Sequence, residues 1–182
     1  MNDNEYTALL SEISSLAEKI VKLCSENGKK LATAESCTGG MLSAAITAVS
    51  GSSSVIELGI CSYSNRIKNE VLGVDTSILE SYTEYSIQCA EAMANGVRKN
   101  ALSNYAVSTT GVAGPTGGTS DHPVGEVCIG ISTDKTNYGE RYVFTQKSGD
   151  CFSARDYIRA SAAKQALICL YDAIKKDLST ER

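Results

Sequence analysis

Apolar residues at the start of the chain follow the spacing of an amphipathic helix. They recur at alternating steps of four and three residues, at Leu9, Ile13, Leu16, Ile20 and Leu23. Asn-Gly at residues 27–28 predicts the end of this helix. Residues 29–36, KKLATAES, predict a short buried strand, and a second helix is expected to open at the TGG of residues 38–40. The first part of the chain therefore predicts a helix, then a strand, a turn and another helix.

The next segment continues the alternation of strands and helices. Residues 55–63 are mostly apolar and predict a second strand, in which Gly59 indicates a close backbone approach or a bulge. A short helix is expected from Asn65, one or two helical turns capped by Asp75, and a longer helix capped by Ser86.

The second half of the chain predicts a hairpin. YAVSTTG at residues 105–111 indicates a strand that enters a loop over residues 111–125, which holds both prolines and a high density of glycine. Apolar residues alternate over residues 127–131, and ERYVFTQ at residues 140–146 is strand-like, so these two segments predict an antiparallel hairpin. A final helix is expected to begin near Ser153.

Helices that alternate with strands, followed by a hairpin, define the fold class. The alternation predicts a parallel sheet covered on both faces, and the hairpin makes this sheet mixed. We therefore predict a three-layer α/β/α sandwich with a mixed, mostly parallel central sheet. The 182 residues contain no linker or internal repeat and are close to the usual size of one domain, so residues 1–182 are expected to form a single domain.

Charge and cysteine content exclude several classes of protein. The 17 basic and 21 acidic residues give a net charge of −4 without long like-charged runs, which argues against a nucleic-acid partner. No basic leader and no apolar stretch of membrane-spanning length is seen, so we expect a cytoplasmic protein with no membrane partner. The seven cysteines form no C-x-x-C pair, and no His/Cys/carboxylate grouping has metal-ligand spacing. We therefore expect no metal and no cofactor.

Candidate chemistry lies where the predicted strands end. In an open α/β sheet, ligands bind outside the carboxyl ends of the strands. Three unusual sequences follow such ends, namely ESCTGG at residues 35–40, YSNRIK at residues 63–68 and TTGVAGPTGG at residues 109–118. We expect the three loops to converge on one site.

Ser36 and Lys68 are the candidate nucleophile and base. The turn after Ser36 has two interpretations: an ordinary helix N-cap, or a helix start whose N–H groups stabilise an oxyanion. Because the chain has a single histidine, His122, a base for the serine is sought at Lys68, with the Tyr63 hydroxyl in the same pocket. An exposed lysine beside a half-buried tyrosine is the commoner arrangement. Lys68 would act as a base only if its pKa fell from about 10.4 toward neutrality.

The glycine-rich loop matches neither nucleotide-binding motif. GVAGPTGG at residues 111–118 lacks the Lys and Ser/Thr of a P-loop and the spacing of the dinucleotide fingerprint. Its N–H groups suit a phosphate or a sugar, although such loops are often only turns. His122 is interpreted as a loop residue rather than a base.

Taken together, the motifs resemble the CinA C-terminal domain family. The resemblance covers about residues 10–175 and is carried, in order, by TAESCTGG (33–40), YSNRIK (63–68), LGV (72–74), TTGVAGPTGG (109–118) and HPVGEV (122–127). It implies a compact α/β/α domain, here similar to the stand-alone form, with nicotinamide mononucleotide (NMN) deamidase activity. The implied reaction converts NMN and water to nicotinic acid mononucleotide and ammonia. The family tends to form dimers, so the resemblance also allows a homodimer.

The resemblance assigns a role to each matching residue. Ser36 is the implied nucleophile, Lys68 and Tyr63 move protons, and N–H groups of Thr38, Gly39 and Gly40 hold the oxyanion. The implied contacts of the phosphate and ribose are Asn65, Thr110, Gly111, Ala113, Gly114, Gly117, Gly118 and Arg155.

Two departures from the family pattern affect the predicted site. Many members read GAVS before the long helix, whereas residues 83–86 read TEYS and place Glu84 and Tyr85 near a loop that borders the pocket. Members often carry G-D-R before the last helix, and here Arg155 is the best match to that arginine although CFSA intervenes.

Two other functions compete with NMN deamidation. One is a non-catalytic module that binds a nucleotide or a partner, as the family's link with competence and DNA-damage responses suggests. The other is hydrolysis of a related small amide, because carboxamide chemistry discriminates less than the contacts to phosphate and ring.

Overall fold

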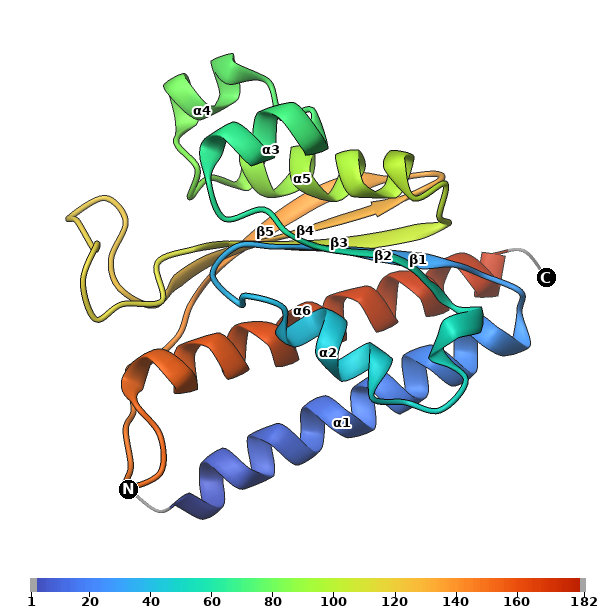
Figure 1. The fold of residues 1–182 in the computed structure, drawn as a ribbon, viewed down its shortest axis with the longest axis horizontal. Helices are drawn as coiled ribbons and strands as arrows, with labels where there is room; N and C mark the ends of the chain where they lie inside the picture. Colours follow the sequence, from blue (N-terminus) through green and yellow to red (C-terminus); the bar gives the residue numbers. More distant parts are fainter. Residues whose placement is uncertain (1–2, 181–182) are drawn as a thin grey trace.

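The computed structural model describes residues 3–180. A central five-stranded sheet lies between two groups of helices (Figure 1). The strands are β1 Leu31–Glu35, β2 Ile56–Cys61, β3 Tyr105–Gly111, β4 Glu126–Thr133 and β5 Asn137–Val143. The helices are α1 Asp3–Glu26, α2 Met41–Thr47, α3 Asn65–Leu72, α4 Thr76–Tyr82, α5 Ile87–Asn100 and α6 Ala154–Thr180, with a 3₁₀ turn, η1, at Ser52–Ser54.

The sheet is mixed, as the sequence predicts. Its strand order is β2-β1-β3-β4-β5, with β1 parallel to β2 and β3, and with β4 antiparallel to β3 and β5. Four strands therefore run in one direction, and β4 runs against them. The hairpin of β4 and β5 pairs Ser132 with Asn137, three residues earlier than the predicted second strand, because a tight turn closed by Thr133 and Thr136 reverses the chain at once.

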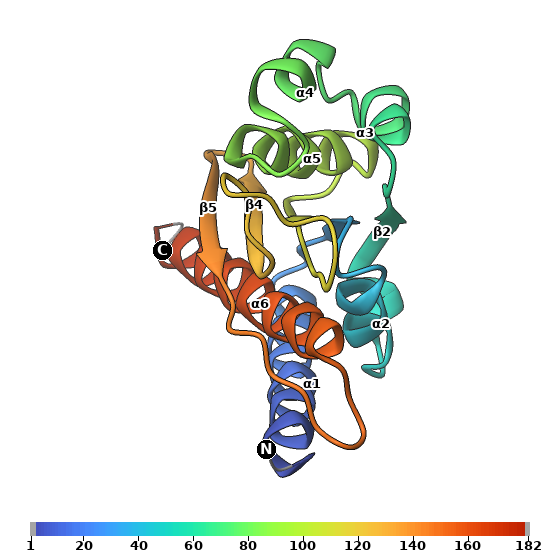
Figure 2. The same cartoon turned by 90° about the vertical axis from the view of Figure 1, so that its left-hand side faces the viewer.

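The two faces of the sheet are covered differently. Helices α3, α4 and α5 lie on one face, and α2 and α6 lie on the other, with α1 packed along α6 (Figures 1 and 2). Because neighbouring strand residues point to opposite faces, large side chains such as Val107, Ile129 and Ile131 face α6. Small ones, Ala32, Ala34 and Ala106, face α5. The three-layer prediction is confirmed.

Local signals in the sequence place several helix ends correctly. Ser64 caps α3, Asp75 caps α4 and Ser86 caps α5, each accepting a backbone N–H. Helix α2 begins at Met41, three residues after the predicted start. Gly39 and Gly40 have φ angles of 60° and 96°, so the chain turns through left-handed conformations before the helix can form.

Gly59 marks a close approach, as expected from its place in β2. A Cβ atom at Gly59 would lie 2.4 Å from the Ser43 hydroxyl of α2. Glycine therefore lets α2 settle directly on the sheet. Within residues 3–180, no helix is both long and apolar enough to cross a membrane.

Candidate active site

The carboxylate of Glu35, the last residue of β1, holds the start of α2. Oε2 accepts hydrogen bonds from the Thr38 hydroxyl at 2.7 Å and from the N–H groups of Gly40 and Leu42 at 3.0 Å. Oε1 accepts from the N–H of Ser43 at 2.9 Å and from its hydroxyl at 2.8 Å. Glu35 is fully buried, so these five bonds replace the water that its charge loses.

A second ring of hydroxyls completes this network. The Thr109 hydroxyl on β3 lies 2.7 Å from that of Thr38, and the Thr33 hydroxyl lies 2.7 Å from that of Ser43. Each hydroxyl has one proton, and those of Thr38 and Ser43 are donated to Glu35. The hydroxyls of Thr109 and Thr33 therefore donate to Thr38 and Ser43. The N–H groups of Gly40, Leu42 and Ser43 are thus all bonded to the Glu35 carboxylate.

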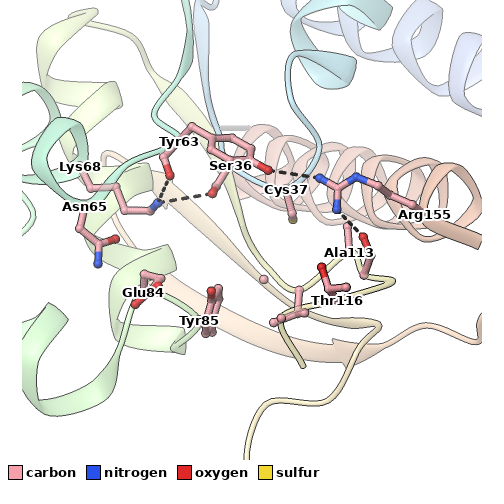
Figure 3. A pocket seen from close by; sticks show the side chains of 14 residues that line it. Ser36, Cys37, Tyr63, Asn65, Lys68, Glu84, Tyr85, Ala113, Thr116 and Arg155 are labelled. Atoms are coloured by element: carbon pink, nitrogen blue, oxygen red, sulfur yellow. Dashed lines mark hydrogen bonds between the residues drawn. The ribbon is translucent and has the colours of Figure 1, made fainter. Parts of the chain in front are cut away.

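Ser36, the next residue, points away from this network and toward α3. Its own N–H donates to the Thr109 carbonyl at 2.9 Å, which fixes the backbone against β3. Its hydroxyl lies 3.4 Å from Nζ of Lys68, which reaches in from the first turn of α3 (Figure 3). The predicted nucleophile and base are therefore brought together.

Lys68 is a buried lysine without a carboxylate partner. The residue is 1% exposed, and no acidic side chain among residues 3–180 lies within ion-pair distance of its Nζ. Besides Ser36, Nζ contacts the Tyr63 carbonyl at 3.4 Å. Burial lowers the pKa of Lys68, while Glu84 raises it by a smaller amount. Burial therefore shifts the balance of Lys68 from the charged form toward the neutral amine.

The buried thiol of Cys37 is a second candidate nucleophile at this turn. Burial raises the pKa of its thiol to about 12. A thiol with this pKa is protonated at neutral pH, which leaves Ser36 as the better candidate nucleophile.

The backbone carbonyl and the side-chain hydroxyl of Tyr63 have different partners. Its backbone carbonyl contacts Lys68, whereas its hydroxyl accepts a hydrogen bond from Arg155 of α6 at 3.2 Å (Figure 3). The residue is 66% exposed. The sequence predicts that the hydroxyl works with the lysine amine, but the hydroxyl is hydrogen-bonded to Arg155, which also donates to the Gly114 carbonyl.

These side chains surround a pocket of about 250 Å³ at the end of the sheet where β1 and β3 finish. It is lined by Ser36, Cys37, Tyr63, Asn65, Lys68, Glu84, Tyr85, Gly111, Val112, Ala113, Gly114, Thr116, Gly117 and Arg155. All three predicted loops converge here, with the N-terminal end of α6 on the far side (Figure 3).

The glycine-rich loop offers free N–H groups to this pocket. Within residues 3–180, no protein acceptor takes the N–H of Ala113, Gly114, Thr116 or Gly117. These residues line the pocket next to the Arg155 guanidinium. This wall is therefore suited to a negatively charged group.

Five predicted binding residues lie outside the pocket lining. Thr38, Gly39 and Gly40 serve the turn instead: the Gly39 N–H donates to the Ser36 carbonyl and the Gly40 N–H to Glu35. The protein's own acceptors therefore occupy these two N–H groups, and their role in holding an oxyanion stays a prediction.

Thr110 and Gly118 also have structural contacts. The fully buried Thr110 hydroxyl donates to the Glu84 carbonyl at 2.5 Å. A Cβ atom at Gly118 would lie 2.8 Å from a Val124 methyl group, so glycine lets the loop close on itself.

Some pocket residues were not predicted as binding residues. The sequence marks Glu84 and Tyr85 only as departures from the family pattern near the pocket, and both line it. Arg159 of α6 donates to the carbonyls of Cys37 and Thr38, at 3.2 and 2.9 Å, and so supports the turn after Ser36. Helical periodicity contains no signal for this last contact, because it joins residues far apart in the sequence.

The fold and the pocket define an α/β/α domain with a serine–lysine pair and a glycine-rich loop at the carboxyl ends of parallel strands. The model of the CinA C-terminal domain matches residues 13–174, and the chain belongs to this family. The expected resemblance is confirmed.

Relatives and solved structures agree with this assignment. A CinA-like protein of Shewanella piezotolerans is 40% identical over 168 residues, which cover 89% of this chain and 40% of the relative. The chain thus spans less than half the length of this curated relative. The crystal structure of competence/damage inducible protein CihA from Agrobacterium tumefaciens superimposes with a TM-score of 0.82 and 34% identity, covering 90% of this chain and 96% of that one. A CinA superfamily protein from Klebsiella pneumoniae gives a TM-score of 0.81 and 28% identity, covering 90% and 98%.

Proposed function

We propose that this protein is an amidohydrolase that converts NMN and water to nicotinic acid mononucleotide and ammonia. The observation that carries the proposal is the contact between Ser36 and the buried Lys68, whose pKa is lowered by burial. A serine becomes a nucleophile when an adjacent base accepts its proton, and a desolvated lysine is such a base. The family resemblance supplies the substrate.

The first half of the proposed reaction forms an ester on Ser36. Neutral Lys68 accepts the hydroxyl proton as Oγ attacks the carboxamide carbon. The carbon–nitrogen bond then breaks, and the amine takes the proton from Lys68 and leaves as ammonia. Lys68 returns to its neutral form.

The second half releases the acid. Lys68 accepts a proton from a water molecule that attacks the ester, and the Ser36 oxygen leaves with that proton. The carboxylic acid so formed loses its remaining proton to solvent, and the product is nicotinic acid mononucleotide with its carboxylate. The Tyr63 carbonyl accepts a hydrogen bond from Lys68, and its hydroxyl accepts one from Arg155.

The phosphate of the substrate is assigned to the wall opposite Lys68. Arg155 and the free N–H groups of residues 113–117 provide a cation and several donors. Asn65, at the start of α3, lies at the Lys68 end and is available to a ribose or amide group. The substrate therefore spans the pocket, with its amide at Ser36.

Ammonia release from NMN tests this proposal. Purified wild-type protein is expected to release ammonia, and Ser36→Ala is expected to abolish release while leaving nucleotide binding intact. Comparing kcat/KM for nicotinamide, its riboside and NMN identifies the part of the substrate that is recognised. Binding of NMN without ammonia release by the wild type would instead favour a non-catalytic nucleotide-binding module.

A further inference from the structure

The segment between α4 and α5 brings two side chains into the pocket. Glu84 and Tyr85 line it across from Ser36 and at the same end as Lys68, whereas Arg155 lies at the opposite end (Figure 3). Neither Glu84 nor Tyr85 has a role in the proposed proton transfers. Both side chains lie where they can contact the part of the substrate that carries the reacting amide.

The backbone of this segment is fixed to the ends of the sheet. Thr110 of β3 donates to the Glu84 carbonyl at 2.5 Å, and the Cys128 thiol of β4 donates to the Tyr85 carbonyl at 3.1 Å. The Tyr85 ring packs on the His122 ring with centroids 5.6 Å apart. The backbone of both residues and the Tyr85 ring are therefore held in place before a ligand arrives, which reduces the entropy lost on binding.

The Glu84 carboxylate has no ion-pair partner in the part of the chain that the structure describes. Lys68 is the nearby cationic residue, and it must be neutral to act as a base. When Lys68 is neutral, the charge of Glu84 remains uncompensated at the end of the pocket where the amide reacts. The aromatic ring of Tyr85 beside it also favours a cation.

The pocket therefore has charges of opposite sign at its two ends. Arg155 and the free N–H groups of the loop provide a positive end, and Glu84 with Tyr85 provides a negative end. A ligand that carries an anion at one end and a cation at the other complements both ends.

We infer that Glu84 and Tyr85 select substrates whose amide-bearing ring carries a positive charge. This inference rests on the proposed amidase function and extends it to specificity. In NMN the ring is a pyridinium cation, whereas in its reduced dihydropyridine form the ring is uncharged and the phosphate is unchanged. The two forms are a matched pair of probes for ring charge.

Calorimetric binding of the two forms to Ser36→Ala protein, which does not turn them over, measures the preference directly. The charged form is expected to bind more tightly. Adding Glu84→Gln is expected to reduce the ratio of the two affinities by about tenfold, which corresponds to about 1.4 kcal/mol. Tyr85→Leu, which removes the aromatic ring, is expected to reduce the ratio by a smaller factor.

Glu80→Gln is the matched control, since Glu80 is exposed on α4 and does not line the pocket. Equal affinity for the two forms, or a preference that Glu84→Gln does not change, would overturn the inference even if the wild type releases ammonia. A preference that depends on Glu84 in a protein that releases no ammonia would overturn only the deamidase function. Failure of both forms to bind would overturn both proposals.

Discussion

Glu35 and Ser36 are neighbours at the end of β1, yet their surroundings are opposite in character. Glu35 makes five hydrogen bonds of 3.0 Å or less on the α2 side of the sheet. Among residues 3–180, the Ser36 hydroxyl has one hydrogen-bond contact, of 3.4 Å, with Lys68 on the α3 side. The alternation of side chains along a strand puts the two residues on different faces.

The difference separates a scaffold from a reactive site. Every acceptor position of Glu35 is used, so its network fixes the turn and leaves nothing for a ligand. The Ser36–Lys68 pair is buried and loosely bonded, which costs stability but leaves both groups ready to react.

Loss of the reactive pair should abolish activity without unfolding the protein. Ser36→Ala or Lys68→Met is expected to lower kcat/KM for ammonia release by at least about a thousandfold, because the nucleophile or its base is removed. Thermal unfolding should show a native transition in both variants. Lys99→Met, at an exposed site on α5, is the control and should keep activity. Turnover that survives in Ser36→Ala would contradict the serine mechanism.

A substitution in the Glu35 network should lower stability and leave the activity of the folded protein nearly unchanged. Glu35→Gln places an amide NH₂ against N–H and hydroxyl donors whichever way it is turned, so we expect a loss of about 3 kcal/mol in unfolding free energy. The kcat of the molecules that remain folded should change by only a few fold. Urea unfolding followed by circular dichroism measures the first quantity. A Glu35→Gln protein as stable as Glu80→Gln would show that the network is not a scaffold.

The buried lysine should itself reduce stability. Burial lowers the pKa of Lys68 in the folded state below its ordinary value of 10.5, so its charged form destabilises the native state at neutral pH. Lys68→Met is therefore expected to raise the unfolding free energy by about 1 kcal/mol or more at pH 7. This gain should shrink as the pH rises toward 10.5, where the unfolded lysine also loses its proton. A gain that is constant with pH would argue against a charged Lys68 as its cause.

The smallest expected effect concerns the pH at which Lys68 loses its proton. Because Glu84 raises the pKa of Lys68, Glu84→Gln is expected to move the midpoint of the rising pH–rate profile to lower pH. Steady-state kinetics across pH 6–10 measure this midpoint, with Glu80→Gln as reference. A midpoint that stays unchanged or moves to higher pH would show that Glu84 does not act on the lysine.

The sequence predicts the fold and the reacting pair for physical reasons. Periodicity and capping residues locate most elements, and a serine at a strand end faces a lysine one helical turn into α3 because both follow parallel strands. These signals are local or follow from the topology of the sheet.

The rest of the site depends on contacts between distant segments. The sequence shows that Glu35 and Gly40 are close along the chain, but not that the carboxylate takes the Gly40 N–H, one of the groups assigned to an oxyanion. The direction of the Tyr63 hydroxyl depends on Arg155, which comes 92 residues later. Such side-chain partners are set by tertiary packing, which periodicity does not encode.

The measurement that tests the central claim most directly is the pH dependence of kcat/KM for ammonia release from NMN. With neutral Lys68 as the base for Ser36, the rate should rise with pH through a midpoint below the ordinary lysine value of 10.5, and Lys68→Met should remove this rise. A rate that does not depend on pH, or a Lys68→Met protein with the same profile as the wild type, would contradict the account.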